Sequence, residues 1–499
     1  MQINKIQTNE KTNFKGPLDS AVTATLRTFD KNPMVNAVGI DLVAMVGPRT
    51  FIDAKKRNKY AGAETFIREF MSTLTTCLVA SYIARGISHI ANKTYQSQNK
   101  INPKSWFSND SLEFLQEAHK NTVNTEEYVK NVINTLPDDF NYSELIEEKD
   151  WKKFKWDNQN YKGIEKRIVD KDTLAKELTK IIEDKNLTNA DRKRLSFILD
   201  LRTTNLIGKD SVNLNLNGKK LSASVASLMR DTIDMGRDIF SKKPNEQKAL
   251  IDKITKVNKT KNLGAIAITS ALGLMSQHIN RKITEKRTGT KGFVGDVNYA
   301  DNVGKKKSTK DNSMTFWAKK IAASVGIIGL ALGIMKVKSP KDFIKKLELT
   351  GPVTSGNAIK TVYASTLTGR FLASDNKDEL RESVTRDYFG FLNWLVLGGF
   401  AAKGAANLLD KNRKDLFHET KNGKGLKHWL NDVSLKSHNE IAVRGEAFAK
   451  KNMWKLNLAH TAGLAYSTVA LGIVLPLINI WVTNRKNKHL TQRQNSVSC

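Results

Sequence analysis

"LAHTAGLAYSTVALGIVLPLINIWV", residues Leu458–Val482, contains no formally charged side chain, although 26% of the residues in this chain are charged. A spanning helix needs roughly 20 apolar residues, each adding about 1.5 Å, to cross about 30 Å of hydrocarbon. The stretch exceeds that length, and Trp481 stands near its end, where an amphipathic ring prefers the membrane interface. Pro476 predicts a kink, because it leaves the carbonyl of Gly472 without its helical partner. The stretch fits a membrane span or the buried helix of a soluble protein, and its length favours the span.

Shorter apolar stretches recur along the chain, and they lie at residues 33–48, 70–84, 262–280, 321–335 and 388–402. Several reach spanning length only if the flanking lysines extend their charged ends toward water. Lys and Arg flank nearly every stretch, so the positive-inside rule gives no orientation. The pattern fits helical hairpins, partial insertion or helices on an anionic surface as well as a series of spans.

Composition and periodicity predict a mainly α, multi-helix membrane-associated protein with a soluble helical domain that contains one small β-hairpin. Leu174, Leu178 and Ile182 follow a helical period, and Thr188 with Asp191 forms a capping-box pattern. Alternating apolar residues before Asn217 and Gly218 predict the hairpin. The expected divisions are an N-terminal tail (1–32), an apolar helical hairpin (33–91), the soluble domain (92–260, hairpin near 211–223), membrane-associated helices with basic connectors (261–484) and a basic C-terminal tail (485–499).

The charge and motif content limit the class of protein. A net charge of +31 favours anionic partners, namely anionic lipid or nucleic acid. Two cysteines cannot form a disulfide framework or a four-thiolate metal site. The histidines His418, His428 and His438 recur every ten residues, a spacing that does not place two of them one helical turn apart, as a zinc site on a helix requires. No phosphate loop or nucleophile elbow is present. We therefore predict no catalytic, cofactor-binding or metal-binding residue, no cofactor and no enzymatic activity.

Two further patterns indicate contact surfaces. Gly326, Gly329 and Gly333 are spaced so that helix backbones could approach closely in lipid, although glycine in any tightly packed helix does the same. Between residues 151 and 163, aromatic rings alternate with lysines, which suits either a membrane interface or single-stranded nucleic acid, or local core packing. The residues singled out there are Trp151, Lys152, Lys153 and Trp156.

Opposite charges one helical turn apart, Arg49 with Asp53 and Glu64 with Arg68, predict an ion-pair cluster that joins two helices together with Glu69 and Arg85. A structural clasp is favoured over catalysis, since paired networks also concentrate charge. The surrounding segment, residues 45–70, resembles a multi-copy group of uncharacterised bacterial membrane-associated proteins. That resemblance implies membrane association and no assigned activity. The matching positions are Pro48, Arg49, Thr50, Asp53, Arg57, Gly62, Glu64, Thr65, Arg68 and Glu69.

The sequence thus predicts a structural or adaptor protein of the inner (cytoplasmic) membrane. Its expected partners are a bilayer with anionic lipids and either another protein or a second copy of the chain. One alternative is a transporter or pore, for which Asp41, Asn393 and Lys403 are the polar residues available to line a path. A second alternative is a soluble basic protein that binds nucleic acid.

Overall fold

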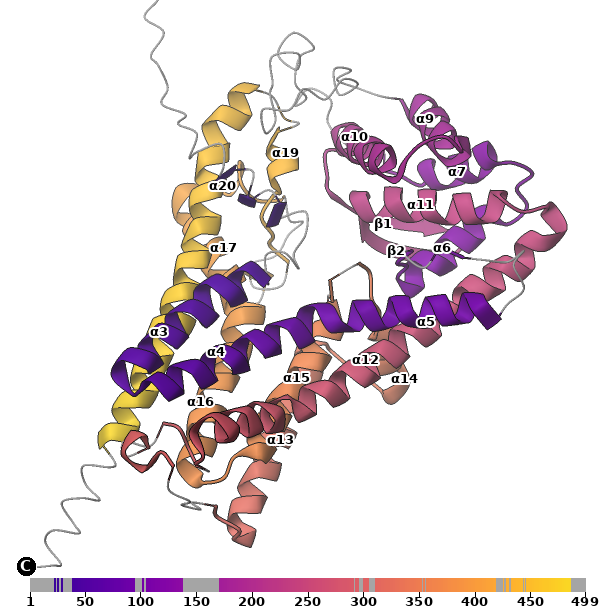
Figure 1. The fold of residues 1–499 in the computed structure, drawn as a ribbon. Helices are drawn as coiled ribbons and strands as arrows, with labels where there is room; N and C mark the ends of the chain where they lie inside the picture. Colours follow the sequence, from indigo (N-terminus) through magenta and orange to yellow (C-terminus); the bar gives the residue numbers. More distant parts are fainter. Residues whose placement is uncertain are drawn as a thin grey trace, which may run out of the picture.

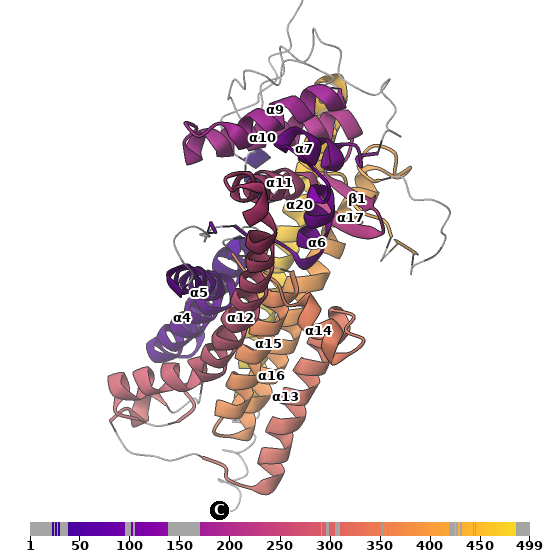
Figure 2. The same ribbon diagram turned by 90° about the vertical axis from the view of Figure 1, so that its right-hand side faces the viewer.

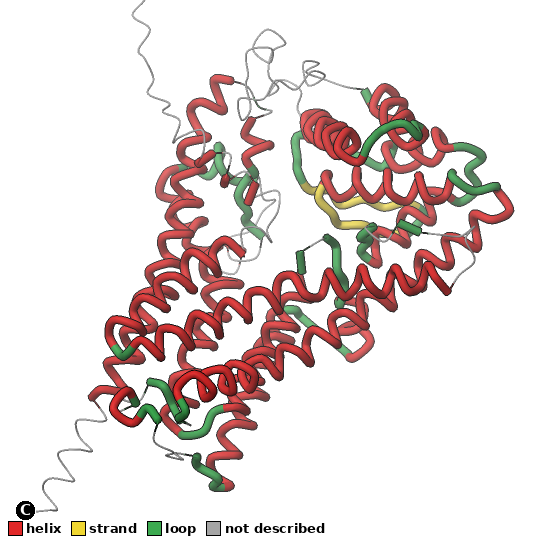
Figure 3. Tube along the Cα trace, in the orientation of Figure 1, coloured by secondary structure: helices red, strands yellow, loops and turns green. Residues whose placement is uncertain are grey.

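The computed structural model describes residues 38–94, 105–137, 170–290, 310–351, 356–418, 432–442 and 446–485, with short stretches before and between them. These residues form mainly helices and a single antiparallel pair of strands (Figure 3). The prediction of a mainly α fold with one small β-hairpin is confirmed. Figures 1 and 2 show a helical domain at one end of the molecule and a body of longer helices at the other.

The helical domain has its own hydrophobic core, built from residues between Ile101 and Val257. Its elements are α6 (Asn109–His119), α7 (Thr125–Ile133), α9 (Lys171–Glu183), α10 (Asn189–Ile207), β1 (Ser211–Leu216), β2 (Lys219–Ser224), α11 (Val225–Phe240) and the start of α12 (Pro244–Thr288). Leu174, Leu178 and Ile182 face this core from α9, as their helical period predicts. Thr188 and Asp191 cap α10 reciprocally, which confirms the predicted capping box.

The hairpin turns at Asn217 and Gly218, as predicted. Both residues have positive φ, 49° and 84°, which suits a two-residue turn between twisted strands. The register pairs Leu214 with Leu221, and both side chains lie in the core of the helical domain. Alternation of buried and exposed residues along β1 is therefore produced by the apolar period of two in the sequence.

The body is assembled from helices at both ends of the sequence. Its elements are η1 (Ile40–Val46), α3 (Gly47–Lys56), α4 (Lys59–Leu74), η2 (Thr75–Val79), α5 (Ala80–Thr94), the remainder of α12, η5 (Ala300–Asn302), α13 (Met314–Ile334), α14 (Pro340–Lys346), α15 (Gly356–Ala373), α16 (Lys377–Leu392), η6 (Asn393–Leu397), α17 (Gly398–Leu409), α19 (His438–Ala442), α20 (Glu446–Ser467) and η7 (Thr468–Val474). Beyond η7 the chain remains helical as far as Arg485. The labels η1, η2, η6 and η7 denote π-helical segments.

A hairpin of α3 and α4 opens the body. The chain leaves the helical conformation between Arg57 and Asn58, and the Asn58 side chain accepts a hydrogen bond from the amide of Ala61 at 2.8 Å, which caps α4. Gly62 lets the two helices cross closely, since a Cβ atom there would lie 2.5 Å from Cβ of Ala54. This hairpin lies within the predicted segment 33–91.

Helix α12 connects the two parts. It runs for 45 residues without a break, and the predicted boundary at residue 260 falls inside it. Its first turns join the domain core through Leu250, Ile254 and Val257, whereas Ala265 and Ile266 pack with α5 and α15 in the body. The domain and the body therefore share one helix, and a tilt of the domain would have to bend it.

Three helices in the described part of the chain are long and apolar enough to cross a membrane, by length and composition only. They are Lys59–Lys93, Met314–Ile334 and Ala447–Arg485. The last contains the stretch Leu458–Val482.

Candidate functional site

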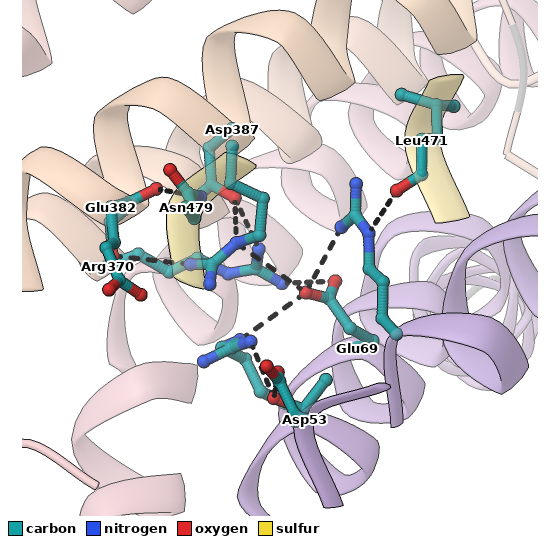
Figure 4. Close-up of polar contacts among 12 residues, drawn as sticks. Asp53, Glu69, Arg370, Glu382, Asp387, Leu471 and Asn479 are labelled. Atoms are coloured by element: carbon teal, nitrogen blue, oxygen red, sulfur yellow. Dashed lines mark hydrogen bonds and ion pairs between the residues drawn. The ribbon is translucent and has the colours of Figure 1, made fainter. Parts of the chain in front are cut away.

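Glu69 of α4 lies at the centre of a buried ion-pair network in the body (Figure 4). Four guanidinium groups surround its carboxylate. Arg49 Nη1 and Arg68 Nε lie 3.4 Å from Oε1, Arg386 Nε lies 3.9 Å from Oε1, and Arg370 Nη2 lies 3.1 Å from Oε2. The side chains of Glu69 and Arg370 are only 4% and 2% exposed. At this depth each charge depends on its partners, because little water can solvate it.

Asp387 of α16 provides the second carboxylate of the network. Arg370 Nη1 and Arg386 Nε each lie 3.0 Å from its Oδ1 atom. Arg370 therefore bridges Glu69 on α4 and Asp387 on α16, two residues far apart in the sequence. Arg49 Nη2 and Asp387 Oδ2 are buried without a hydrogen-bond partner among the described residues.

A branch of the network reaches one end of the body through Arg57. Its Nε atom lies 3.3 Å from Asp53 Oδ1, and its Nη2 atom lies 2.8 Å from Glu382 Oε2. The hydroxyl of Thr65 donates to Asp53 at 2.6 Å, and the hydroxyl of Thr483 donates to Glu382. The branch joins α3, α4, α16 and the last helix of the chain.

Arg49 also connects the network to the apolar stretch near the C-terminus. Its Nε atom donates to the main-chain carbonyl of Leu471 at 2.9 Å. Leu475 donates to the carbonyl of Ala470, five residues earlier, so Leu471 would need the amide of residue 476 in the same π-helical register. Residue 476 is proline and has no amide hydrogen, so the Arg49 guanidinium donates this hydrogen bond to Leu471 instead.

The sequence predicts that Pro476 leaves the carbonyl of Gly472 open, and the structure changes this detail. The acceptor served by Arg49 belongs to Leu471 and not to Gly472, because the helix is π-helical at this point. Gly472 has a different role. A Cβ atom there would lie 2.1 Å from the carbonyl oxygen of Ala44 and 3.0 Å from Cβ of Pro48, so η1 and η7 touch along their backbones.

The network contains five arginines and four carboxylates: Arg49, Arg57, Arg68, Arg370, Arg386, Asp53, Glu69, Glu382 and Asp387. Asp41 lies on η1 nearby, buried, and accepts a hydrogen bond from the hydroxyl of Thr73. Removing one member of such a network leaves an uncompensated buried charge, which costs about 3–5 kcal/mol. What this arrangement can do is hold helices in one register. The described residues contain no group of three side chains placed to hold a metal ion.

The predicted cluster of Arg49, Asp53, Glu64 and Arg68 lies within this region, with different pairings. Arg49 pairs with Glu69, Asp53 pairs with Arg57, and Arg68 lies between Glu69 and the hydroxyl of Thr65. Glu64 is buried, and its main-chain carbonyl accepts a hydrogen bond from the side chain of Asn280 of α12 at 3.4 Å. Arg85 is distant from Glu69 and places its guanidinium 5.8 Å from the centre of the Trp106 ring.

Sequence reasoning missed Arg370, Glu382, Arg386 and Asp387. These residues lie between the apolar stretches 321–335 and 388–402, in a segment for which the sequence predicts no contacts. One signal was available, because Arg386 and Asp387 directly precede the apolar stretch 388–402, where a charged pair would be buried if that stretch were buried. Glu69, the partner of Arg370 on α4, lies 301 residues earlier, and no local pattern indicates that distance.

The three glycines of α13 differ in their surroundings. A Cβ atom on Gly326 would lie 2.2 Å from the hydroxyl of Tyr388 on α16, so this position packs closely inside the chain. Gly329 and Gly333 have nothing within 4 Å of such an atom among the described residues. The proposed contact residues Trp151, Lys152, Lys153 and Trp156, and most of the two predicted tails, lie outside the described residues.

A second titratable cluster lies where the domain meets the body. Lys261 Nζ donates to the carbonyl of Ser105 at 2.5 Å and lies 4.9 Å from the centre of the Trp106 ring. Burial raises the pKa of Asp234 to about 7 and that of Asp238 to about 6, and it lowers the pKa of Lys261 to about 8. These groups belong to the domain and its junction and lie outside the three candidate spans.

Comparison with known proteins adds no relative. No family model matches the chain, and no curated protein or solved structure matches it.

Proposed function

We propose that this chain is a structural or adaptor protein embedded in the inner (cytoplasmic) membrane through the helices of its body. The observation that carries the proposal is the distribution of polarity. The body buries a set of arginines and carboxylates and exposes large apolar side chains, the opposite of what water would favour; the buried set includes Arg49, Arg370, Arg386, Glu69 and Asp387. Its relation to the bacterial membrane-associated group that residues 45–70 resemble is part of the same proposal.

The exposed apolar side chains lie on helices that are long enough to cross a membrane. On α13 the exposed side chains of Met314, Ile321, Val325 and Ile328 recur every three to seven residues, so they form a stripe along the helix. On the last helix, Leu471 is buried whereas Ile473 and Ile478 are 39% and 46% exposed. In lipid, these exposed faces would contact acyl chains at no cost, and in water they would be a large apolar patch.

The paired network supports a structural role. Without a hydrophobic force between helices in lipid, polar contacts and close packing hold them together. Glu69, Arg370 and Asp387 provide such contacts between α4, α15 and α16, and Gly472 provides the close approach of η7 to η1. The helical domain, carried on α12, is the part available to engage a partner, either another protein or a second copy.

Fractionation tests the membrane proposal directly. We expect the protein to stay with the membrane pellet after a high-salt wash and again after alkaline carbonate. Release by salt alone would mean a peripheral, electrostatic attachment. Recovery in plain buffer would refute the membrane proposal and would favour the soluble nucleic-acid-binding alternative, whose binding should fall steeply with salt.

A pair of matched substitutions makes the test sharper. Val325 on α13 and Val123 in the helical domain are 63% and 84% exposed, so Val→Asp at either position should be nearly neutral in a water-soluble protein. If α13 faces lipid, Val325→Asp costs about 2.5–3.5 kcal/mol of insertion free energy and lowers the membrane-integrated fraction. Val123→Asp should leave that fraction unchanged. An equal membrane-integrated fraction for the two variants would contradict the proposal.

Transport is the second candidate, because charged groups inside an apolar-faced body are a recurring feature of transport pathways. Asp41, Asn393 and Lys403 have protein contacts: Asp41 with Thr73, Asn393 with Tyr466, and Lys403 with the carbonyl of Trp429. A flux assay in proteoliposomes with Asp41→Ala and Lys403→Ala variants separates the two functions. Flux that either substitution abolishes would favour the transporter.

A further inference from the structure

One end of the body combines exposed basic side chains with exposed aromatic rings. Its position is defined by contacts: Arg57 reaches Gly295 and Glu382, Arg281 pairs with Asp375 and Glu379, and Arg381 donates to Thr483 at 2.6 Å. These contacts bring together the α3–α4 turn, the end of α12, the start of α16 and the end of the last helix. We call this end the basal collar, and its exposed basic residues are Lys55, Lys59, Lys282, Lys286, Arg287 and Arg485.

Four of the acidic side chains at the basal collar are already engaged by other cations. Asp375 and Glu379 pair with Arg281, Glu382 pairs with Arg57, and Asp311 lies 3.5 Å from Lys377. The six basic residues that define the collar are therefore not offset by these acids. Their summed charge makes this end attractive to anions.

Aromatic rings lie beside these charges. Trp481 is 60% exposed and has the Arg485 guanidinium 5.3 Å from its ring centre, and Phe51 is 64% exposed with Lys55 Nζ at 5.6 Å. Trp317, 45% exposed, lies one turn into α13. Aromatic rings paired with Lys or Arg at the end of an apolar surface are typical of the headgroup layer of a bilayer.

The apolar surface begins at the collar and extends away from it. On the last helix the exposed apolar residues run from Trp481 back to Leu458, a distance of about 35 Å along the axis. On α12 they run from Ile283 to Ile268. The first distance is close to the hydrocarbon thickness of a bilayer, about 30 Å.

The helical domain lies at the far end of the same surface. Helix α13 starts at the collar, where Lys320 Nζ donates to the carbonyl of Leu372, and it ends next to α14. There Lys345 pairs with Asp110 at 3.2 Å, and Asn109 donates to the carbonyl of Lys345 at 2.9 Å, so α14 contacts the start of α6 in the domain. One length of α13, about 31 Å, separates the collar from this docking point. Figures 1 and 2 both show the domain at the opposite end of the molecule from the start of α13.

We propose that the basal collar binds the headgroups of anionic lipids in the cytoplasmic leaflet and that the helical domain lies on the other side of the bilayer. This inference rests on the proposed membrane function and adds its orientation. Anionic lipids of the cytoplasmic leaflet attract basic side chains, and the tertiary structure gathers such side chains at the collar, which the loop charges of the sequence alone do not reveal. At the far end of α13, Lys345 pairs with Asp110 and Lys346 with Asp342, whereas Lys336, Lys338 and Lys341 are exposed.

Orientation is tested with two single cysteines on the same helix. Lys286→Cys places the thiol at the collar and Lys248→Cys places it in the domain, in a chain carrying Cys499→Ser and retaining the buried Cys77. An impermeant maleimide should label position 286 only in inside-out vesicles and position 248 only in right-side-out vesicles, with the parent chain as the unlabelled control. Labelling of both from the same side would overturn the inference while leaving membrane attachment intact. Protein in the soluble fraction would instead refute the proposed function.

Lipid binding is tested with matched charge removals on α12. One variant carries Lys282→Gln, Lys286→Gln and Arg287→Gln at the collar, and the control carries Lys248→Gln, Lys256→Gln and Lys259→Gln in the domain. From mixed bilayers of phosphatidylglycerol and phosphatidylcholine, the wild type and the control should co-purify with phosphatidylglycerol enriched about five-fold or more over the collar variant. Equal enrichment in all three would overturn the lipid assignment. Collar-dependent binding of a single-stranded oligonucleotide in detergent, with no preference between the two lipids, would assign the collar to nucleic acid.

Discussion

Arg49 donates a hydrogen bond from Nε to the main-chain carbonyl of Leu471, a residue 422 positions later in the chain, and from Nη1 it also pairs with Glu69. One side chain thus satisfies a carbonyl that Pro476 leaves open and balances a buried carboxylate. The N-terminal hairpin and the C-terminal apolar helix are joined by this residue. Its two roles can be separated by substitution.

Replacing Pro476 tests the first role. Arg49→Met leaves Glu69 with one cation fewer and the Leu471 carbonyl without a donor, so it should lower the free energy of unfolding by about 3–5 kcal/mol. In a Pro476→Ala background, residue 476 has an amide hydrogen of its own, and the cost of Arg49→Met should fall by about 1 kcal/mol. Denaturant unfolding of the four proteins in detergent gives this double-mutant cycle.

The proline control is Pro340→Ala at the exposed start of α14. It should leave the cost of Arg49→Met unchanged, since Pro340 is distant from the network. A cycle that is additive with Pro476→Ala would mean that the Leu471 carbonyl does not need Arg49.

Glu69 should be the most sensitive carboxylate of the network. Glu69→Gln keeps the shape of the side chain but removes the charge that faces four guanidinium groups, so we expect a loss of about 3–5 kcal/mol. Glu126 pairs with Lys130 on the surface, with side chains 44% and 40% exposed, and Glu126→Gln should cost far less, because water screens this pair. Thermal unfolding in detergent measures both variants. Equal decreases in unfolding temperature would show that burial in the network does not make Glu69 more important for stability than a surface carboxylate.

Two glycines provide a matched test of helix packing. Gly472→Ala places a methyl group against the backbone of Ala44 and should cost about 1–3 kcal/mol, because that backbone has no space to move away. Gly329→Ala meets no atom of the described residues within 4 Å and should gain up to about 1 kcal/mol through helix propensity. Unfolding measurements show whether each substitution lowers or raises the free energy of unfolding. A loss at Gly329 would show that a partner, such as a second copy, covers this face of α13.

The domain junction should lose stability as the pH rises. Burial raises the folded-state pKa of Asp234 to about 7 and that of Asp238 to about 6, so both bind protons more tightly in the folded protein than in the unfolded chain, where an Asp titrates near 3.9. Their contribution is present below about pH 4 and is lost as the pH passes through 6 and 7. Lys261, with a pKa of about 8, stays mostly protonated in both states up to about pH 7 and adds a slope of the opposite sign only near pH 8.

Hydrogen exchange of α11 peptides measures this effect. Between pH 5 and pH 8 the protection of these amides, corrected for the intrinsic exchange rate, should fall by about 4 kcal/mol. Asp234→Asn removes one of the two groups and should flatten the slope. Unchanged slopes in the variant would contradict the assignment.

Local features of this chain could be predicted from the sequence because their causes are local. The period of Leu174, Leu178 and Ile182 produces α9, and Thr188 caps α10 through an amide three residues away. Asn217 and Gly218 tolerate positive φ and therefore turn the hairpin. The lack of charge between Leu458 and Val482 likewise predicts a long apolar helix, and the structure has one.

The partners of the buried charges could not be predicted in this way. Arg49 and Asp53 are correctly spaced for an ion pair on one helix, yet Asp53 faces Arg57 and Thr65 while Arg49 faces α4 and η7. Which face of α3 is buried, and against what, depends on the crossing at Gly62 and on the contact of Gly472 with Ala44.

The sequence by itself determined the helices, their caps, the hairpin turn and the apolar segments, since these depend on residues within a few positions of one another. Only the tertiary structure decided that Glu69 is surrounded by arginines from α3, α4, α15 and α16, and that basic side chains from four separate segments meet at the basal collar. The physical reason is that a buried charge takes its partners from whichever helix faces pack around it, and that packing involves segments hundreds of residues apart.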